Sequence, residues 1–186
     1  MGLICGVAFG FAMAVLMDRF EKLYRAVYPL VVLTQTVPTV AIAPLLVLWF
    51  GYEMLPKVIL IVITTFFPVT VGVLTGLRSA DKDTMNLLRS MGAGRFQIFR
   101  YVKLPGAMGQ FFSSLRISAY SVVGAVISEW LGGFNGLGVY MTRVKKAFAF
   151  DKMFAVIFLI SIISLLLMKL VDYLQKKCMP WEDVHE

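Results

Sequence analysis

The sequence predicts an all-α protein, a polytopic bundle of helices that crosses a membrane several times. Hydrophobic residues make up 59% of the chain and its mean hydropathy is +0.81, whereas soluble domains contain about 45–50% apolar residues. The charged residues are also grouped, so that they separate long stretches without charge. The 186 residues contain no linker or low-complexity segment, and we therefore expect a single transmembrane domain over 1–186.

Five stretches are apolar enough to cross a membrane. A helix needs about 20 residues to cross roughly 30 Å of hydrocarbon, and the shorter stretches reach this length if basic side chains at their ends, such as Arg116 and Lys169, extend into the headgroup region. The alternative, a buried helix in a soluble core, does not suit uncharged stretches of this length. The expected spans are 1–17, 27–50, 58–77, 111–131 and 153–171.

The distribution of Lys and Arg predicts which side of the membrane each connection faces, because cytoplasmic loops keep an excess of positive charge. Segments 18–28, 78–108 and 172–186 hold eleven basic residues, whereas 51–57 and 132–152 hold five. We therefore expect 78–108 and the C-terminus to be cytoplasmic, in a multi-pass protein of the bacterial inner or plasma membrane.

This orientation places Met1 outside, directly before an apolar helix and without a positively charged segment. We therefore expect one further span upstream of this sequence. The spacing of Gly2, Gly6 and Gly10 in the first span suits close helix packing, although such spacing is common in membrane helices.

The residues that most enzymes and metal sites need are missing from the pattern. The chain has two cysteines, Cys5 and Cys178, in different regions, and its one histidine, His185, lies in the polar tail. This gives no metal-ligand spacing, no pair of nucleophile and base, and no phosphate-binding glycine loop. We expect no enzyme activity and no cofactor in this chain. The net charge of +7 follows from the membrane topology and does not require a nucleic-acid partner.

The sequence of segment 78–108 predicts two short helices with a break between them. Asp83 or Thr84 can cap the first helix, and the glycines at 92 and 94 interrupt it. Leu104-Pro105 is expected to end the second helix before the next span. The apolar stripes are Leu87, Leu88 and Met91 in the first helix and Phe96, Phe99 and Val102 in the second. A helical pair of this kind suits docking into a groove on a partner, while a helix lying on lipid headgroups is the alternative.

The end of this segment resembles a known motif. Gly92, nine further residues and then Val102-Lys103-Leu104-Pro105 are similar to the glycine and the I-x-L-P end of the EAA loop of type I ABC importer permeases. The resemblance implies that 86–105 couples the chain to a cytoplasmic ATPase. Here Asn86-Leu87-Leu88 stands where the family has Glu-Ala-Ala. The residues implied in coupling are Asn86, Leu87, Leu88, Gly92, Ala93, Val102, Leu104 and Pro105.

Further matches extend the resemblance along the chain. They are Gln35-Thr36-Val37-Pro38, Ala43-Pro44, Trp49-Phe50-Gly51, Phe67-Pro68, Glu129-Trp130-Leu131-Gly132 and Gly136-Leu137-Gly138. Together they resemble the nitrate, sulfonate, taurine and thiamine-precursor branch, and are most like permeases for hydroxymethylpyrimidine-type precursors. The resemblance implies six spans, an extracytoplasmic solute-binding protein, and a separate ATPase subunit that holds ATP and Mg. A two-fold homodimer is the expected assembly, since one copy is small for a solute pathway.

Four residues within or near the spans are candidates for the solute pathway. Pro38, Pro44 and Pro68 each remove a backbone hydrogen bond, and the freed carbonyl must be buried in protein or face a cavity; a packing kink is an equally good interpretation for any one of them. Glu129 is an acidic residue at a span, although beside Trp130 it suits a solvated position at the membrane interface.

Outside the membrane, 132–152 is expected to be a loop or a surface helix. Its Arg143, Lys145 and Lys146 could face acidic patches of the binding protein, and a solvated basic face is the commoner explanation. Two other classes remain open: a membrane-embedded enzyme, and a stand-alone secondary transporter or channel. An ion-coupled carrier would need ionisable groups in the middle of a span, which Arg116 and Glu129 do not obviously supply.

Overall fold

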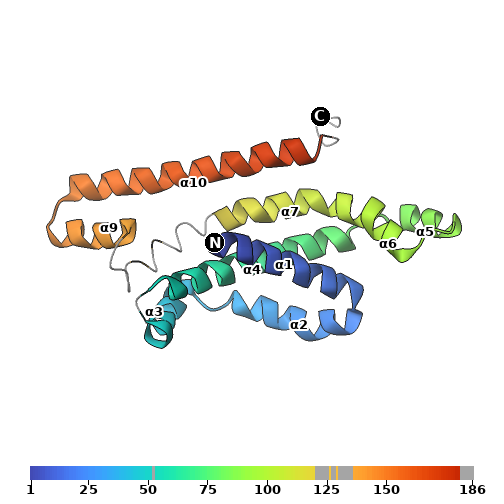
Figure 1. Ribbon diagram of the computed structural model, residues 1–186, viewed down its shortest axis with the longest axis horizontal. Coiled ribbons are helices and arrows are strands. Elements are labelled where there is room, and N and C mark those ends of the chain that lie inside the picture. Colours follow the sequence, from blue (N-terminus) through green and yellow to red (C-terminus); the bar gives the residue numbers. More distant parts are fainter. Residues whose placement is uncertain (52, 120–125, 127–128, 130–135, 181–186) are drawn as a thin grey trace.

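The computed structural model describes residues 1–51, 53–119, 126, 129 and 136–180, with residues 39 and 40 described by their backbone alone. Every regular element in these ranges is a helix, which confirms the all-α prediction. Figure 1 shows most of the helices lying roughly along the long axis, with the N-terminus near the middle of the view.

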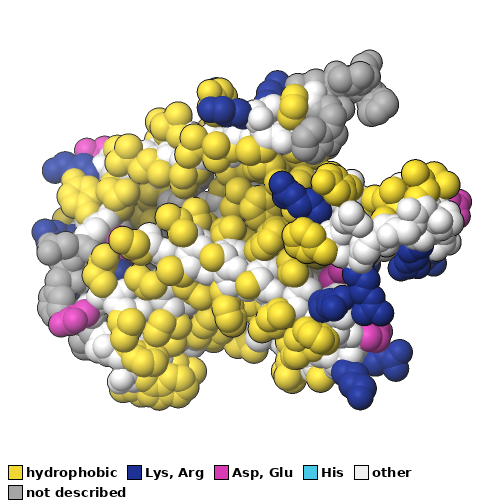
Figure 2. Space-filling view, turned by 45° about the vertical axis from the view of Figure 1, so that its right-hand side comes forward, with side chains coloured by type: hydrophobic (Ala, Val, Ile, Leu, Met, Phe, Trp, Pro, Cys, Tyr) yellow, Lys and Arg dark blue, Asp and Glu magenta, His cyan; other side chains and the backbone are white. Residues whose placement is uncertain are grey.

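Among the described residues, three helices are long and apolar enough to cross a membrane: α1 (Gly2–Arg19), α4 (Met54–Arg78) and α10 (Phe150–Cys178). Their outer faces expose large apolar side chains, for example Phe158 of α10 at 67% exposure. Figure 2 shows hydrophobic side chains over much of the visible surface of the bundle. Because water disfavours an apolar surface of this size, the structure agrees with a multi-pass membrane protein.

Helix α4 is the centre of the bundle, since α1 packs on one of its faces and α7 (Leu104–Ala119) on another. The buried core between these three helices is formed by Ala14, Met17, Val69, Val73, Leu74, Leu77 and Ala107. The seam of α1 and α4 runs along the Gly2, Gly6 and Gly10 stripe, as the spacing suggested. A Cβ at Gly10 would lie 2.9 Å from the carbonyl oxygen of Phe66, so the helices approach backbone to backbone there.

The second seam joins α4 to α7. A Cβ at Gly76 would lie 2.7 Å from the Cα atom of Ala107, and one at Gly72 would lie 2.6 Å from the Cβ of Ser114. Ser114 and Ser118 are buried here, and each donates its hydroxyl to a carbonyl of its own helix, so that neither leaves an unpaired hydroxyl in the seam.

The expected span 27–50 is not one continuous helix. It divides into α2 (Glu21–Thr34) and α3 (Thr39–Phe50), with Pro38 as the N-cap of α3. Proline has no N–H to continue α2, and it disfavours helical geometry at the preceding Val37. The hydroxyls of Thr34 and Thr36 donate to the carbonyl oxygens of Val31 and Leu33, which satisfies the open end of α2. With 12 residues, α3 is about 18 Å long and too short to cross the hydrocarbon alone.

Segment 18–28, expected as a loop, is mostly helical. Helix α1 ends at Arg19 and α2 begins at Glu21, with only the extended Phe20 between them. Arg78 at the end of α4 donates to Glu21 at 2.8 Å and lies 3.5 Å from the centre of the Tyr24 ring. The start of α2 is therefore tied to the end of α4.

The remaining elements are α5 (Lys82–Ser90), α6 (Arg95–Ile98), the π-helical turn η1 (Phe99–Lys103), and α9 (Leu137–Lys146). Helix α9 fits the surface helix expected within 132–152, and residues 132–135 lie outside the described residues. The expected span 111–131 is described as helix α7 up to Ala119, and most of the rest lies outside the described residues.

We predict that Gly76→Ala lowers the stability of the bundle, because the added methyl group meets the backbone of Ala107 and forces α4 and α7 apart. Overpacking of this kind costs on the order of 1–3 kcal/mol, measured as a lower melting temperature in detergent.

The matched control is Gly106→Ala, one residue before Ala107, where nothing lies within 4 Å of the added Cβ. Alanine there is expected to be neutral or to stabilise α7 by up to about 1 kcal/mol. Equal melting temperatures for the two variants would show that the α4–α7 interface accommodates the added methyl group.

Candidate coupling elbow and pathway residues

Residues 81–103, which we call the elbow, extend from one end of the bundle beyond the other helices (Figure 1). Its first helix, α5, is capped by Asp81, whose carboxylate accepts from the backbone N–H groups of Asp83 at 3.2 Å and Thr84 at 2.9 Å. The expectation that Asp83 or Thr84 is the cap was therefore wrong by two or three positions, because the helix already begins at Lys82.

The hydrogen bond from the Thr84 hydroxyl, followed by those from the Thr84 and Asp83 backbone, holds the pKa of Asp81 below its usual range. A lowered pKa in the folded state means that this cap stabilises α5 at pH values above the ordinary aspartate range. The contribution is lost only as the pH falls through the folded-state pKa. The cap is therefore fully formed at neutral pH.

The glycine break between the two elbow helices is a hydrogen-bonded turn. Gly92 has φ of +84°, and its N–H donates to the carbonyl of Arg89, while the N–H of Ala93 donates to that of Leu88. These two bonds form the Schellman arrangement that closes a helix C-terminus, and the left-handed residue in it is usually glycine. Gly94 then starts α6, where its N–H donates to the side chain of Gln97 at 2.7 Å.

The elbow exposes large apolar side chains. Leu87 is 61% exposed, Met91 74% and Phe96 75%. Nothing in the described part of the chain covers these side chains. Among the other candidate coupling residues of α5 and its cap, Asn86 and Gly92 are exposed and Leu88 and Ala93 are half-buried.

The expectation that Leu104-Pro105 ends the second elbow helix is wrong. Helix α6 continues through η1 directly into α7, with Pro105 as the second residue of α7. In η1 the N–H of Leu104 donates to the carbonyl of Phe99, five residues earlier. The wider π-helical turn makes room for the proline ring, which would otherwise clash with the carbonyl four residues before it. Val102, Leu104 and Pro105 therefore lie at the base of the elbow, away from Gly92.

An ion pair that the sequence analysis missed joins the base of the elbow to α1. Lys103 Nζ lies 2.7 and 2.9 Å from the two carboxylate oxygens of Asp18, and the Asp18 side chain is only 9% exposed. The two residues are 85 positions apart, so no local pattern connects them. A carboxylate at the end of an apolar stretch was the one available signal.

The three candidate pathway prolines differ in their place in the helices and in their burial. Pro38 caps α3 and is exposed, Pro44 lies within α3 and is also exposed, and Pro68 lies half-buried within α4. Their pathway role stays a prediction.

Glu129 is partly buried and has partners. Its carboxylate accepts from the N–H of Gly138 at 2.8 Å, at the start of α9. Its other oxygen lies 4.0 Å from Lys57 Nζ of α4, and both side chains are no more than 20% exposed. The carboxylate also fills the space where a side chain at Gly136 would point. The expected neighbours of this motif, Trp130, Leu131 and Gly132, lie outside the described residues.

Arg116 does not extend freely into the headgroup region, as the sequence suggested. It donates to Gln175 at 2.7 Å and lies 3.6 Å from Asp172, so it ties α7 to α10. In the described part of the chain no three His, Cys, Asp or Glu side chains gather in a way that could hold a metal ion. Cys5 and Cys178 are both unpaired and exposed.

Comparisons with known proteins give a consistent picture. Residues 6–179 match the family described as the inner membrane component of binding-protein-dependent transport systems. The formylaminopyrimidine transport permease protein ThiX of Halalkalibacterium halodurans is 38% identical over 181 residues, which cover 97% of this chain and 72% of the relative. The taurine transport system permease protein TauC of Escherichia coli is 31% identical over 184 residues, covering 97% of this chain and 66% of the relative.

A crystal structure of an amino acid ABC transporter with histidines has a similar fold. The match has a TM-score of 0.74 at 16% identity and covers 95% of this chain and 88% of the other. At this identity the likeness concerns the arrangement of the helices.

We predict that Gly136→Ala displaces the Glu129 carboxylate, because the new methyl group would occupy its position, and that the N–H of Gly138 then loses its acceptor. Hydrogen exchange in the first turn of α9 should become about tenfold faster, as expected for a lost hydrogen bond to a charged group. Mass spectrometry of the peptide 136–146 measures it.

Glu129→Ala should reproduce this effect. Glu53→Gln is the matched control, since Glu53 is an exposed carboxylate near the same end of α4 and makes no side-chain cap hydrogen bond. Unchanged exchange in Gly136→Ala would contradict the contact.

Proposed function

Since this chain belongs to the family of inner membrane components of binding-protein-dependent transport systems, we propose that its elbow couples it to a separate ATPase subunit. Membership of this family confirms the resemblance to ABC importer permeases and makes the chain a transmembrane permease subunit. In the proposed assembly ATP and Mg are held by the ATPase, and this chain supplies the path for the solute.

The observation that carries the coupling role is the shape and surface of the elbow. It projects from the bundle, its first helix exposes Leu87 and its C-cap exposes Met91, and its turn is fixed by the Schellman bonds at Gly92. A short amphipathic helix of this kind fits a groove on a partner. The Asp18–Lys103 ion pair and the continuous helix from α6 to α7 connect the elbow to α1 and α7. A displacement of the elbow is therefore transmitted to α1 and α7.

The division of eleven basic residues against five supports an orientation with the elbow and the C-terminus in the cytoplasm. In this orientation α9 lies on the opposite side, where Arg143, Lys145 and Lys146 are suited to acidic patches on a solute-binding protein. The exposed apolar faces leave room for a second permease copy, and a two-fold homodimer would enclose the solute pathway. We assign to that pathway Pro38, which caps α3, together with Pro44 within α3 and Pro68 within α4.

A thiamine pyrimidine precursor is the proposed solute, because the formylaminopyrimidine permease covers 97% of this chain at 38% identity. Taurine, transported by a relative at 31% identity, is the comparison solute. Nitrate and sulfonates remain further choices within the same branch.

We predict that Gly92→Val lowers uptake several-fold and weakens co-purification of the ATPase, while the amount of permease in the membrane stays unchanged. A β-branched residue at φ of +84° is strained by about 1–2 kcal/mol or more, although nothing lies within 4 Å of its Cβ. The lesion is therefore confined to the turn. Uptake of radiolabelled formylaminopyrimidine and of taurine should be measured in parallel.

Gly94→Val is the matched control, since Gly94 has an extended backbone with φ of −73° that valine can adopt. It should keep most of the ATPase binding. Normal uptake and ATPase recovery with Gly92→Val would rule out the coupling role, whereas uptake of taurine alone by the unmodified protein would rule out the pyrimidine assignment.

We predict that single cysteines at Ser90 and Lys146 are labelled from opposite sides of the membrane. In a background of Cys5→Ser and Cys178→Ser, an impermeant maleimide added to intact cells should label Lys146→Cys on α9 and leave Ser90→Cys on the elbow unlabelled. Both positions are exposed in the structure. The reverse pattern would overturn the orientation.

A further inference from the structure

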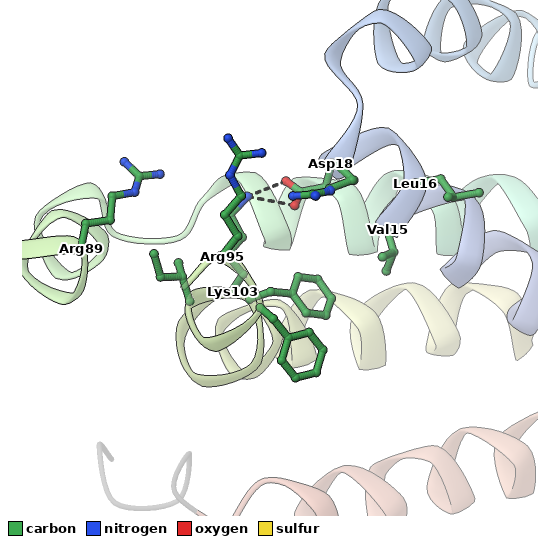
Figure 3. A pocket seen from close by; sticks show the side chains of 10 residues that line it. Val15, Leu16, Asp18, Arg89, Arg95 and Lys103 are labelled. Atoms are coloured by element: carbon green, nitrogen blue, oxygen red, sulfur yellow. Dashed lines mark hydrogen bonds and ion pairs between the residues drawn. The ribbon is translucent and has the colours of Figure 1, made fainter. Parts of the chain in front are cut away.

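A cavity of about 790 Å³ lies between the end of α1 and the elbow. Figure 3 shows its position: Val15, Leu16 and Asp18 come from α1, and Arg89, Arg95 and Lys103 come from the elbow. Its full lining is Val15, Leu16, Asp18, Arg19, Arg89, Arg95, Phe96, Ile98, Phe99 and Lys103. The proposed function gives no role to this space.

The lining has an excess of positive charge. It contains four cationic side chains and one carboxylate, Asp18, which already accepts two hydrogen bonds from Lys103. Arg89 donates to the neutral side chain of Asn86 at 3.3 Å. Within the described part of the chain, Arg19 and Arg95 have no recorded ion-pair partner. The charge of the arginines is therefore not balanced by the protein.

Along α1 the apolar part of the lining precedes the charged part, while the elbow contributes cationic side chains and also Phe96, Ile98 and Phe99. Val15 and Leu16 lie on the side of the membrane-spanning part of α1, and Leu16 is 46% exposed. Asp18 lies at the end of the helix, and the arginines of the elbow lie beyond it (Figure 3). An apolar wall that borders the hydrocarbon and continues into a cluster of arginines matches a molecule with an acyl chain and an anionic head. A free inorganic anion would make no use of the apolar wall.

We propose that this cavity binds the headgroup of an anionic phospholipid. The guanidinium groups of Arg19, Arg89 and Arg95 hold the phosphate oxygens, for which the planar fork of arginine is well suited, and the acyl chain follows Leu16 into the bilayer. The lipid then bridges α1 and the elbow next to the Asp18–Lys103 ion pair. Basic pockets beside spanning helices are suited to such headgroups.

The test uses the purified complex of this permease with its ATPase in a neutral detergent. Dioctanoyl phosphatidylglycerol and dioctanoyl phosphatidylcholine are titrated separately, and native mass spectrometry measures the bound fraction. Phosphatidylglycerol should bind more tightly. Arg19→Gln should weaken its binding about fivefold, as expected for one basic residue near an anionic lipid, and Arg19→Gln with Arg95→Gln should weaken it further.

Lys22→Gln is the matched control, since Lys22 is an exposed cation on the adjoining α2 and does not line the cavity. It should bind within twofold of the unmodified complex. Unchanged melting temperatures without lipid would show that the variants are folded.

Three results would overturn the proposal: equal binding of the two lipids, unchanged phosphatidylglycerol binding in the double variant, or displacement of the lipid by inorganic phosphate at low millimolar concentration, which would indicate a site for a free anion. A loss of ATPase from Arg19→Gln with lipid binding unchanged would instead assign the cavity to the ATPase interface. None of these outcomes depends on the effect of Gly92→Val, so the lipid site and the coupling role are tested separately.

Discussion

The close approach of α4 to its two neighbours is the constraint on which the rest of the structure depends. In a bilayer the lipid tails are as apolar as leucine side chains, so helices gain little from hiding apolar surface and associate through tight packing instead. Gly10 and Gly76 allow backbone contact on two faces of α4. With α1 and α7 fixed on α4, the end of α1 is brought beside the base of the elbow.

The packing of α1 and α7 on α4 also determines the position of the elbow. Asp18 is carried by α1, and Lys103 by the turn that leads into α7, so their ion pair forms only when both helices are packed on α4. Because the Asp18 side chain is only 9% exposed, loss of Lys103 would leave an unpaired buried carboxylate. The elbow is therefore held at its base, while its tip, with Leu87 and Met91, stays open to a partner.

The opposite end of the bundle is organised in a similar way by a different residue. Glu129 links the start of α9 to Lys57 of α4, and Gly136 leaves room for its carboxylate. Arg116 provides a further connection between helices, from α7 to α10. Arg116 and Glu129, which the sequence analysis considered singly, are thus each paired with another helix. This pairing satisfies polar groups that lipid would not solvate.

Composition and hydropathy by themselves determined that this protein is a helical membrane bundle, because apolar length decides membrane insertion and is a local property of the chain. The glycines at 92 and 94 and the motif ending at Pro105 were also enough to locate the elbow and its family. The local sequence did not predict the structure at Pro38 and Pro105. Pro38 separates two helices, whereas a π-helical turn accommodates Pro105 within a continuous helix. That difference depends on backbone geometry that residue type does not specify.

Only the tertiary structure decided which charged residues meet. Asp18 and Lys103 are 85 positions apart, Arg116 and Gln175 are 59 apart, and nothing within a few residues of any of them encodes the partner. Whether such a side chain is paired, solvated or lining a cavity depends on how closely the helices approach, which the glycine seams of α4 set. The sequence therefore determined the fold class and the family, and the packing of the helices decided the contacts, because contacts between distant residues exist only after the helices have come together.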